Sequence, residues 1–153
     1  MKKTVIFILL VVVFVSFVVP TIADRVGFIL CNPQTPVWAR VSPNKNALIC
    51  GILDCGSPIT LDGKTKGNWL HVVDSCFDGD AWIYGGYVVG INVTPETCKA
   101  ITTAKVRTRN MVNGKLTGTL KKGTEVIVYA YSEECCYTNK GYIKSKFLEK
   151  VEE

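Results

Sequence analysis

The chain has 153 residues and a formal net charge of +5, with 18 Lys or Arg residues against 13 acidic ones. This length is that of one domain or of two small ones. No basic run is longer than two residues, as at Lys121-Lys122, so the charge does not indicate a nucleic-acid partner.

The N-terminus has the pattern of a secretory signal peptide. Lys2 and Lys3 precede an apolar run over residues 5–19 that only Ser16 interrupts, and the small residue Ala23 ends the segment. The run is about 15 residues long, whereas a bilayer-spanning helix needs roughly 20. We therefore expect cleavage after Ala23, secretion of residues 24–153, and no membrane span in the processed protein.

Charge is distributed unevenly along the expected mature chain. Residues 24–97 carry five basic and seven acidic residues, a net −2, whereas residues 98–153 carry eleven basic and six acidic residues, a net +5. Such an excess favours an anionic partner, for example a wall polymer, an acidic glycan or a phospholipid surface. The alternative is an ordinary Lys-rich soluble surface.

An internal repeat is the main organising feature of the sequence. Residues 39–61 match residues 106–128 at an offset of 67, and residues 76–88 match residues 136–148 at an offset of 60. In this alignment Arg40 corresponds to Arg107 and Cys76 to Cys136. The change of offset predicts seven additional residues in a loop of the first copy, between Leu61 and Cys76, because loops tolerate insertion at low cost.

Short β-rich runs bounded by Gly, Asn, Asp and Pro fill both copies, and no amphipathic helical period appears after residue 24. The expected strands of the first copy are 37–41, 48–53, 59–61, 69–73 and 81–83, and the clearest ones of the second are 115–120, 125–131 and 141–143. This spacing predicts an all-β protein of two small barrels in tandem. We expect a first domain at 24–90, a linker at 91–97 and a second domain at 98–153.

The segment KVRTRNMVNGKLTGTLKKGTEVIVY and the ending Gly141-Tyr142-Ile143 with Phe147-Leu148 resemble the bacterial-type SH3 (SH3b) family. The first copy is similar at Trp69, Trp82-Ile83 and Tyr87-Val88. The resemblance implies two SH3-like β-barrels, and it implies binding to cell-wall peptidoglycan or peptides. The second copy has Cys135-Cys136-Tyr137 where the family has a mid-domain Trp, which the first copy supplies as Trp69.

All seven cysteines lie beyond the expected cleavage point, where disulfides are more common than metal sites. The repeat aligns Cys31 with Cys98 and Cys76 with Cys136. Equivalent positions in two modules of one fold then predict a bond within each module, and a third bond is open. The predicted pairs are Cys31 with Cys76, Cys98 with Cys136 or alternatively with Cys135, and Cys50 with Cys55. One thiol is left free or links two molecules into a dimer.

The sequence offers little for catalysis. His71 is the single histidine and lies in an expected strand. We therefore interpret it as a half-exposed residue of a sheet and not as a catalytic residue. Asp74, Asp78 and Asp80 lie in a turn-like segment, without the ligand spacing of an EF-hand. We expect no enzyme activity, no metal and no cofactor.

The aromatic residues of the first copy indicate binding instead, since rigid rings bury much area in recognition surfaces. Trp82 and Tyr87 are expected to fill the barrel, which leaves Trp38, Trp69 and Tyr84 as candidate ligand-binding residues. The expected linker also contains Asn92, in the glycosylation triplet Asn-Val-Thr.

The leading interpretation is therefore a secreted, non-catalytic module that recognises a cell-wall or surface polymer, a peptidoglycan-like glycan or peptide. The alternative is a small disulfide-stapled secreted effector or inhibitor that binds an extracellular protein target.

Overall fold

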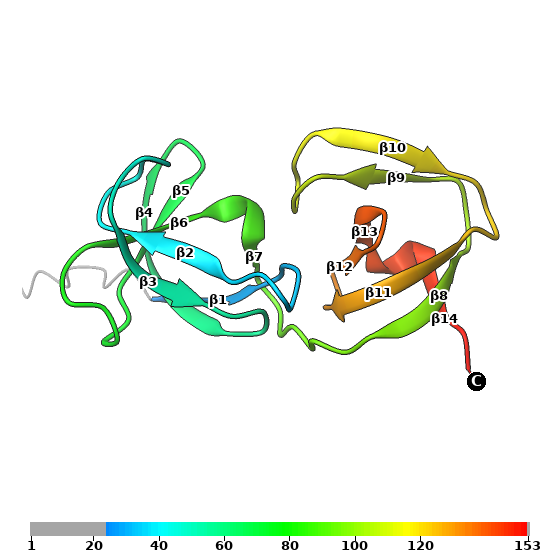
Figure 1. The fold of residues 1–153 in the computed structure, drawn as a ribbon, viewed down its shortest axis with the longest axis horizontal. Helices are drawn as coiled ribbons and strands as arrows, with labels where there is room; N and C mark the ends of the chain where they lie inside the picture. Colours follow the sequence, from blue (N-terminus) through cyan, green and yellow to red (C-terminus); the bar gives the residue numbers. More distant parts are fainter. Residues whose placement is uncertain (1–23, 153) are drawn as a thin grey trace, which may run out of the picture.

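The computed structural model describes residues 24–152, so the expected signal peptide lies outside the described residues. Residues 24–90 form one antiparallel sheet with a short 3-10 turn before its last strand (Figure 1). Its elements are β1 (Arg25–Ile29), β2 (Val37–Arg40), β3 (Ile49–Leu53), β4 (Pro58–Lys66), β5 (Trp69–Val72), β6 (Ala81–Tyr84), η1 (Gly85–Tyr87) and β7 (Val88–Val89).

A second antiparallel sheet with the same succession of elements follows it. Its elements are β8 (Cys98–Thr102), β9 (Val106–Arg109), β10 (Leu116–Leu120), β11 (Glu125–Tyr131), β12 (Cys135–Thr138), β13 (Gly141–Lys144), η2 (Ser145–Phe147) and β14 (Leu148–Lys150). We call β1 to β7 the first module and β8 to β14 the second module. The all-β prediction is confirmed, and within the described residues no helix is long and apolar enough to cross a membrane.

The two modules have the same topology. The strand orders are β3-β2-β6-β5-β4-β1-β7 and β10-β9-β13-β12-β11-β8-β14, and each strand of the first has its counterpart seven strands later. Both sheets run from one edge strand to another. In Figure 1 they lie side by side along the long axis of the molecule, joined by the segment between β7 and β8.

Alternating burial explains why these segments form strands around a core. In β11, Val126, Val128 and Ala130 are buried and alternate with more exposed residues, the period-2 pattern of a half-buried strand. The β12–β13 turn requires glycine, because Gly141 has φ +98° and an added Cβ would meet the Arg109 carbonyl oxygen.

Pairing registers correct the sequence alignment of the repeat. Arg40 pairs with Trp82 in the first module, and Arg109 pairs with Tyr142 at the same place in the second. Arg40 therefore corresponds to Arg109, not to Arg107. The residue that corresponds to Arg107 is Trp38, and β2 and β9 have identical burial patterns.

The extra loop residues lie only partly within the predicted span between Leu61 and Cys76, because the loop that holds most of them continues to β6. Trp69 pairs with Tyr84 in β5–β6, as Cys135 pairs with Lys144 in β12–β13, so Trp69 corresponds to Cys135. The additional residues lie mainly after β5, in the loop that contains Cys76. The second module has a tight turn there, and Cys76 has no counterpart at Cys136.

Cys31 and Cys98 are not equivalent either. Cys98 opposes Val128 at the start of β8, in the register at which Arg25 opposes Leu61 in β1, whereas Cys31 follows β1. The bonds Cys31–Cys76 and Cys98–Cys136 were predicted because the repeat seemed to place these cysteines at equivalent positions. The strand registers show that the positions are not equivalent, so the repeat no longer supports these two bonds.

Each module has its own apolar core, and a third buried cluster joins the two. This inter-module cluster contains Leu30, Val89, Val93, Ala130, Cys135 and Tyr142. The Tyr142 hydroxyl donates a hydrogen bond of 2.9 Å to the Leu30 carbonyl, which holds the modules together in an apolar setting. Val93, in the segment expected to be a polar linker, is only 4% exposed.

Candidate binding groove

The first module and the second together form a groove of about 520 Å³. Strands β2, β5 and β6 and the turn η1 supply one wall, and the β9–β10 loop, β12 and β13 supply residues of the other. We call it the aromatic groove, and the residues that define it here are Trp38, Arg40, Lys45, Trp69, Tyr84, Tyr87, Asn110, Met111, Tyr137 and Tyr142.

The three residues predicted to bind a ligand, Trp38, Trp69 and Tyr84, all line this groove. They come from three different strands, and sheet pairing brings them together, since β2 pairs with β6 and β6 with β5. Tyr87 also lines the groove, in addition to packing against the core of the first module as expected. Trp82 does not line it and is half-buried beside His71.

The aromatic rings are held in fixed orientations. Trp69 meets Tyr84 edge to face at 5.5 Å between ring centroids, and Tyr84 meets Tyr87 in the same manner at 6.4 Å. The Asn68 amide donates a hydrogen bond of 2.9 Å to the Tyr84 hydroxyl. Trp38 is 52% exposed, an unusual exposure for so large an apolar side chain, and the Arg40 guanidinium lies 5.5 Å from its ring centroid.

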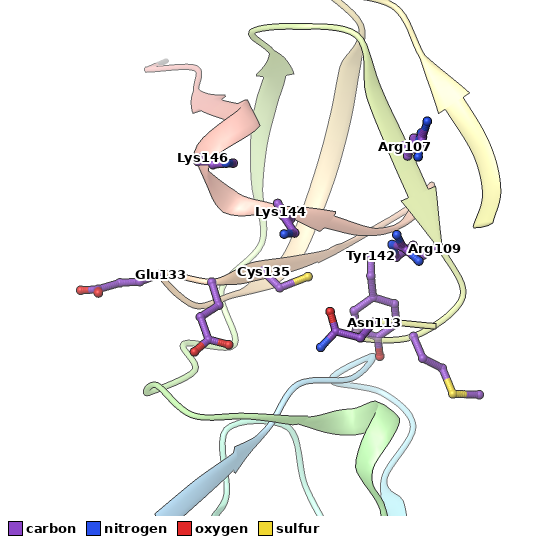
Figure 2. Close-up of a pocket in the computed structure, with 10 residues that line it drawn as sticks. Arg107, Arg109, Asn113, Glu133, Cys135, Tyr142, Lys144 and Lys146 are labelled. Carbon is purple, nitrogen blue, oxygen red and sulfur yellow. The ribbon is translucent and has the colours of Figure 1, made fainter. Parts of the chain in front are cut away.

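A second cavity of about 390 Å³ lies on the second module (Figure 2). Four cationic side chains line this basic pocket, namely Arg107, Arg109, Lys144 and Lys146, together with Met111, Asn113, Glu133, Glu134, Cys135 and Tyr142. Figure 2 shows Glu133 extending away from the two arginines. The basic pocket was not predicted, although the basic excess of residues 98–153 was a signal for it.

The basic pocket and the aromatic groove occupy equivalent positions in the two modules. By the strand registers, four residues of the aromatic groove correspond one to one with four residues of the basic pocket. The pairs are Trp38 with Arg107, Arg40 with Arg109, Trp69 with Cys135 and Tyr84 with Lys144. The fold thus presents the same surface positions twice. The arginine is shared, and two of the three ring positions of the first module carry a cation in the second.

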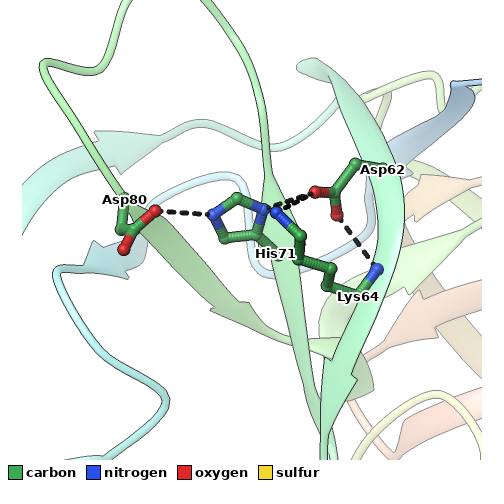
Figure 3. Close-up of polar contacts among 4 residues, drawn as sticks. All are labelled: Asp62, Lys64, His71 and Asp80. Carbon is green, nitrogen blue, oxygen red and sulfur yellow. Dashed lines mark hydrogen bonds and ion pairs between the residues drawn. The ribbon is translucent and has the colours of Figure 1, made fainter.

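His71 differs from the half-exposed sheet residue expected from the sequence. It is 6% exposed, its Nδ1 lies 2.9 Å from Asp62 Oδ2, and its Nε2 lies 3.1 Å from Asp80 Oδ1 (Figure 3). Burial alone would raise the pKa of Asp62, but hydrogen bonds from the Lys64 backbone N–H, the Lys64 ammonium and His71 lower that pKa to about 2. These contacts join β4, β5 and the loop after β5, and none of the residues that make them lines either cavity.

The acidic turn after β5 has the solvated character expected of it. Asp78 and Asp80 are exposed, and Asp74 accepts a hydrogen bond of 3.0 Å from the Thr60 N–H. Among the described residues, no group of three or more His, Cys, Asp or Glu side chains is placed to hold a metal ion.

All seven cysteines are free thiols in the structure. The Cys31 thiol hydrogen-bonds with that of Cys55, whose Sγ also donates to the Cys31 carbonyl at 3.2 Å, while Cys76 is exposed. Cys98 and Cys136 line one small cavity of about 240 Å³.

The remaining thiols lie in different settings. Cys50 is half-buried against the core of the first module, and Cys135 is buried in the inter-module cluster, where burial raises its pKa to about 12. The bonds predicted for the cysteines, like glycosylation of the exposed Asn92, stay predictions.

No family model matches the chain, and no curated protein matches it. Solved structures of NlpC2 and NlpC1 from Trichomonas vaginalis align with 84% and 82% of the chain, at 16% and 17% identity and TM-scores of 0.34 and 0.35. These alignments cover 48% and 45% of those proteins, so the chain spans about half the length of the solved chains that it matches.

Proposed function

We propose that this chain is a secreted, non-catalytic binding protein that recognises a cell-wall or surface polymer through the aromatic groove. The observation that carries the proposal is the convergence of Trp38, Trp69 and Tyr84 on one groove to which both modules contribute. A ligand bound there meets rings of fixed orientation, which lose little conformational freedom on binding.

Further support comes from the architecture. Two modules of identical strand order, each with its own core, fit the tandem SH3-like barrels of the SH3b resemblance. The exposure of Trp38 fits recognition as well, because an exposed Trp in a concave surface gains much buried area when a ligand covers it. The activity proposed is binding alone, without cofactor or metal, after export by the N-terminal segment.

Sedimentation with insoluble polymers tests the proposal. The mature protein should sediment with peptidoglycan, chitin or whole cells, and Trp38→Ala should weaken that binding about tenfold, because it removes a ring of the contact surface. Leu48→Ala is the matched control, since Leu48 is 76% exposed and does not line the groove.

Two results would count against the proposal. Failure to sediment with all three materials, together with capture of a protein from the native extracellular fluid, would favour the effector or inhibitor interpretation. Equal binding by Trp38→Ala and the unsubstituted protein would show that the aromatic groove is not the site.

A further inference from the structure

The two equivalent cavities are adjacent. Met111 and Tyr142 line both the aromatic groove and the basic pocket. The β9–β10 loop that carries Met111 is fixed on the first module, because the Val112 N–H donates to the Gly86 carbonyl at 3.0 Å. Gly86 leaves room for the Met111 side chain, which an added Cβ would contact. A ligand can therefore pass from one cavity to the other over a fixed boundary.

The charge along this path is strongly positive. The lining residues of the two cavities include six cations, Arg40, Lys45, Arg107, Arg109, Lys144 and Lys146, against two acids, Glu133 and Glu134. No acidic residue lines the aromatic groove, although residues 24–97 carry a net −2. The acidic residues of the first module thus lie elsewhere, and the local potential of the groove favours an anion.

Several of these cations have unpaired side chains. The side chains of Arg107 and Lys144, like that of Lys45, make no hydrogen bond or ion pair with any described residue, whereas the Arg109 guanidinium donates to the Gly114 carbonyl. A guanidinium can bind a carboxylate or phosphate with two parallel hydrogen bonds. In the basic pocket, Arg107 and Lys144 are therefore among the groups available to a ligand, while Arg109 mainly holds its own turn.

We propose that the ligand is an acidic polysaccharide, with sugar rings on Trp38, Trp69 and Tyr84 and with its anionic groups on Arg107 and Lys144. This inference rests on the binding function proposed above and names the ligand class. A sugar ring presents an apolar C–H face that packs on an aromatic ring, and it presents hydroxyls that suit neutral side chains such as Asn110 and Asn113. Repeating units of ring and anion match an aromatic cavity that continues into a cationic one.

Calorimetric titration of the mature protein with four probes tests the proposal. The probes are oligogalacturonate, which carries carboxylates, sulfated dextran, chito-oligosaccharide, which is neutral, and oligoglutamate. We expect one or both of the acidic glycans to bind at least about tenfold more tightly than the other two probes, and we expect that binding to weaken as salt is raised. The two acidic glycans distinguish carboxylate from sulfate as the anion.

Substitutions locate the anion site. The double variant Arg107→Gln/Lys144→Gln should weaken binding of the acidic glycan about tenfold. Lys121→Gln/Lys122→Gln changes the net charge equally at exposed positions that line neither cavity, and it should bind as the unsubstituted protein does. An equal loss in both double variants would indicate a non-specific charge effect and would overturn the proposal.

The outcomes separate this inference from the proposed function. The protein could bind chito-oligosaccharide and both acidic glycans with equal affinity and lose that binding in Trp38→Ala. This result would overturn the proposal that the ligand is acidic, but it would support the proposed binding function. Equal or tighter binding of oligoglutamate would overturn the polysaccharide. If none of the four probes binds, and if the protein does not sediment with any of the insoluble polymers, both proposals are overturned.

A separate observation concerns the thiols of the first module. The side chains of Cys31 and Cys55 hydrogen-bond each other, and Cys55 Sγ lies 3.2 Å from the Cys31 carbonyl oxygen. The Gly56 N–H donates to the Ile29 carbonyl at 2.8 Å, which fixes the two chain segments side by side. Hydrogen bonding from Cys31 lowers the pKa of Cys55, which favours its thiolate.

From this contact we infer that Cys31 and Cys55 form a disulfide when a disulfide donor such as glutathione disulfide is present. The Cys55 thiolate attacks one donor sulfur and releases a thiolate, which takes up a proton. The Cys31 thiol then loses its proton, attacks Cys55 Sγ and releases the second donor thiol. In total the protein loses two protons and two electrons, and the donor disulfide is reduced to two thiols.

Non-reducing peptide mapping after exposure to glutathione disulfide tests this pair. A peptide that joins Cys31 to Cys55 is expected, and it should persist in Cys50→Ser as a control. In Cys31→Ser, the thiol of Cys55 should instead retain a glutathione adduct, the trapped first step. A Cys31–Cys76 linkage, or free Cys31 and Cys55 after oxidation, would overturn the inference.

Discussion

The two modules share one framework and differ in what that framework presents. Arg40 and Arg109 occupy the same position and do the same work, each donating to a carbonyl of the turn that follows its strand, Ala47 in the first module and Gly114 in the second. The positions around them differ in chemistry, with Trp38 on β2 where β9 has Arg107. The shared arginine stabilises the turn in both modules, and the differing residues at the neighbouring positions determine what each module can bind.

The largest expected effect concerns whether the modules unfold as one unit. Leu30 is fully buried in the inter-module cluster, and Leu30→Ala should lower the free energy of unfolding by about 3 kcal/mol, because it leaves a cavity there. All three Trp residues lie in the first module, so fluorescence reports on that module and far-ultraviolet circular dichroism on both. In urea, both signals should move to a lower midpoint together.

Leu48→Ala, at an exposed position, serves as the control for Leu30→Ala. If only the fluorescence midpoint moved, the modules would be energetically independent. Residues 98–153 expressed alone should then fold as stably as they do in the whole chain.

A second effect separates the modules by acid sensitivity. Asp62 binds His71 in the first module, while the position of His71 is occupied by Tyr137 in the second. The pKa of Asp62 is about 2 in the folded protein against an ordinary value of 3.8, so the ionised carboxylate stabilises the fold. This contribution is fully present above about pH 4, is lost as the pH falls towards 2, and amounts to about 2 kcal/mol.

Asp62→Asn should therefore lower the free energy of unfolding at pH 6, and its difference from the unsubstituted protein should shrink as the pH falls from 4 to 2. Chemical denaturation at several pH values measures this difference. Asp78→Asn, at an exposed position in the acidic turn, should leave stability nearly unchanged. A constant difference across that pH range would show that the Asp62 carboxylate does not titrate with a lowered pKa.

The smallest expected effect concerns an ion pair near the modules' junction. Lys150 Nζ lies 3.2 Å from Glu96 Oε1, and both side chains are at least half exposed. Water screens such a pair, so Lys150→Gln should shift the thermal midpoint by no more than the error of calorimetry. A clear fall would mean that this contact helps to hold the segment before β8 on the second module.

The strands were largely predictable because their residues alternate or cluster in the manner of β-structure. The segment 125–131, for example, coincides with β11. The repeat was also visible in the sequence, but the correct alignment of its two copies was not. Identical residues allowed the extra residues to be placed before β5 as easily as after it. The agreement of Cys76-Phe77 with Cys136-Tyr137 favoured the wrong placement, and only hydrogen-bonded pairing shows which residues oppose each other.

That error explains why half of the candidate site was missed. The sequence alignment paired Arg107 with Arg40, whereas its counterpart in the sheet is Trp38, already a candidate for binding. The aromatic half was accessible from the sequence because the first copy has more aromatic residues than one small core can enclose. The inter-module cluster was not, since a contact between Leu30 and Tyr142 joins residues that no local pattern relates.

The hydrogen bond from Tyr142 to Leu30 and the apolar cluster around it have a consequence for avidity. Two binding modules on a flexible tether gain an effective concentration that falls as the tether lengthens, because the second site must search a volume. Here the two cavities share Met111 and Tyr142 as a common wall, so no search is needed. A polymer held in one cavity is already in reach of the other, provided that the spacing of its repeating units matches the fixed spacing of the cavities.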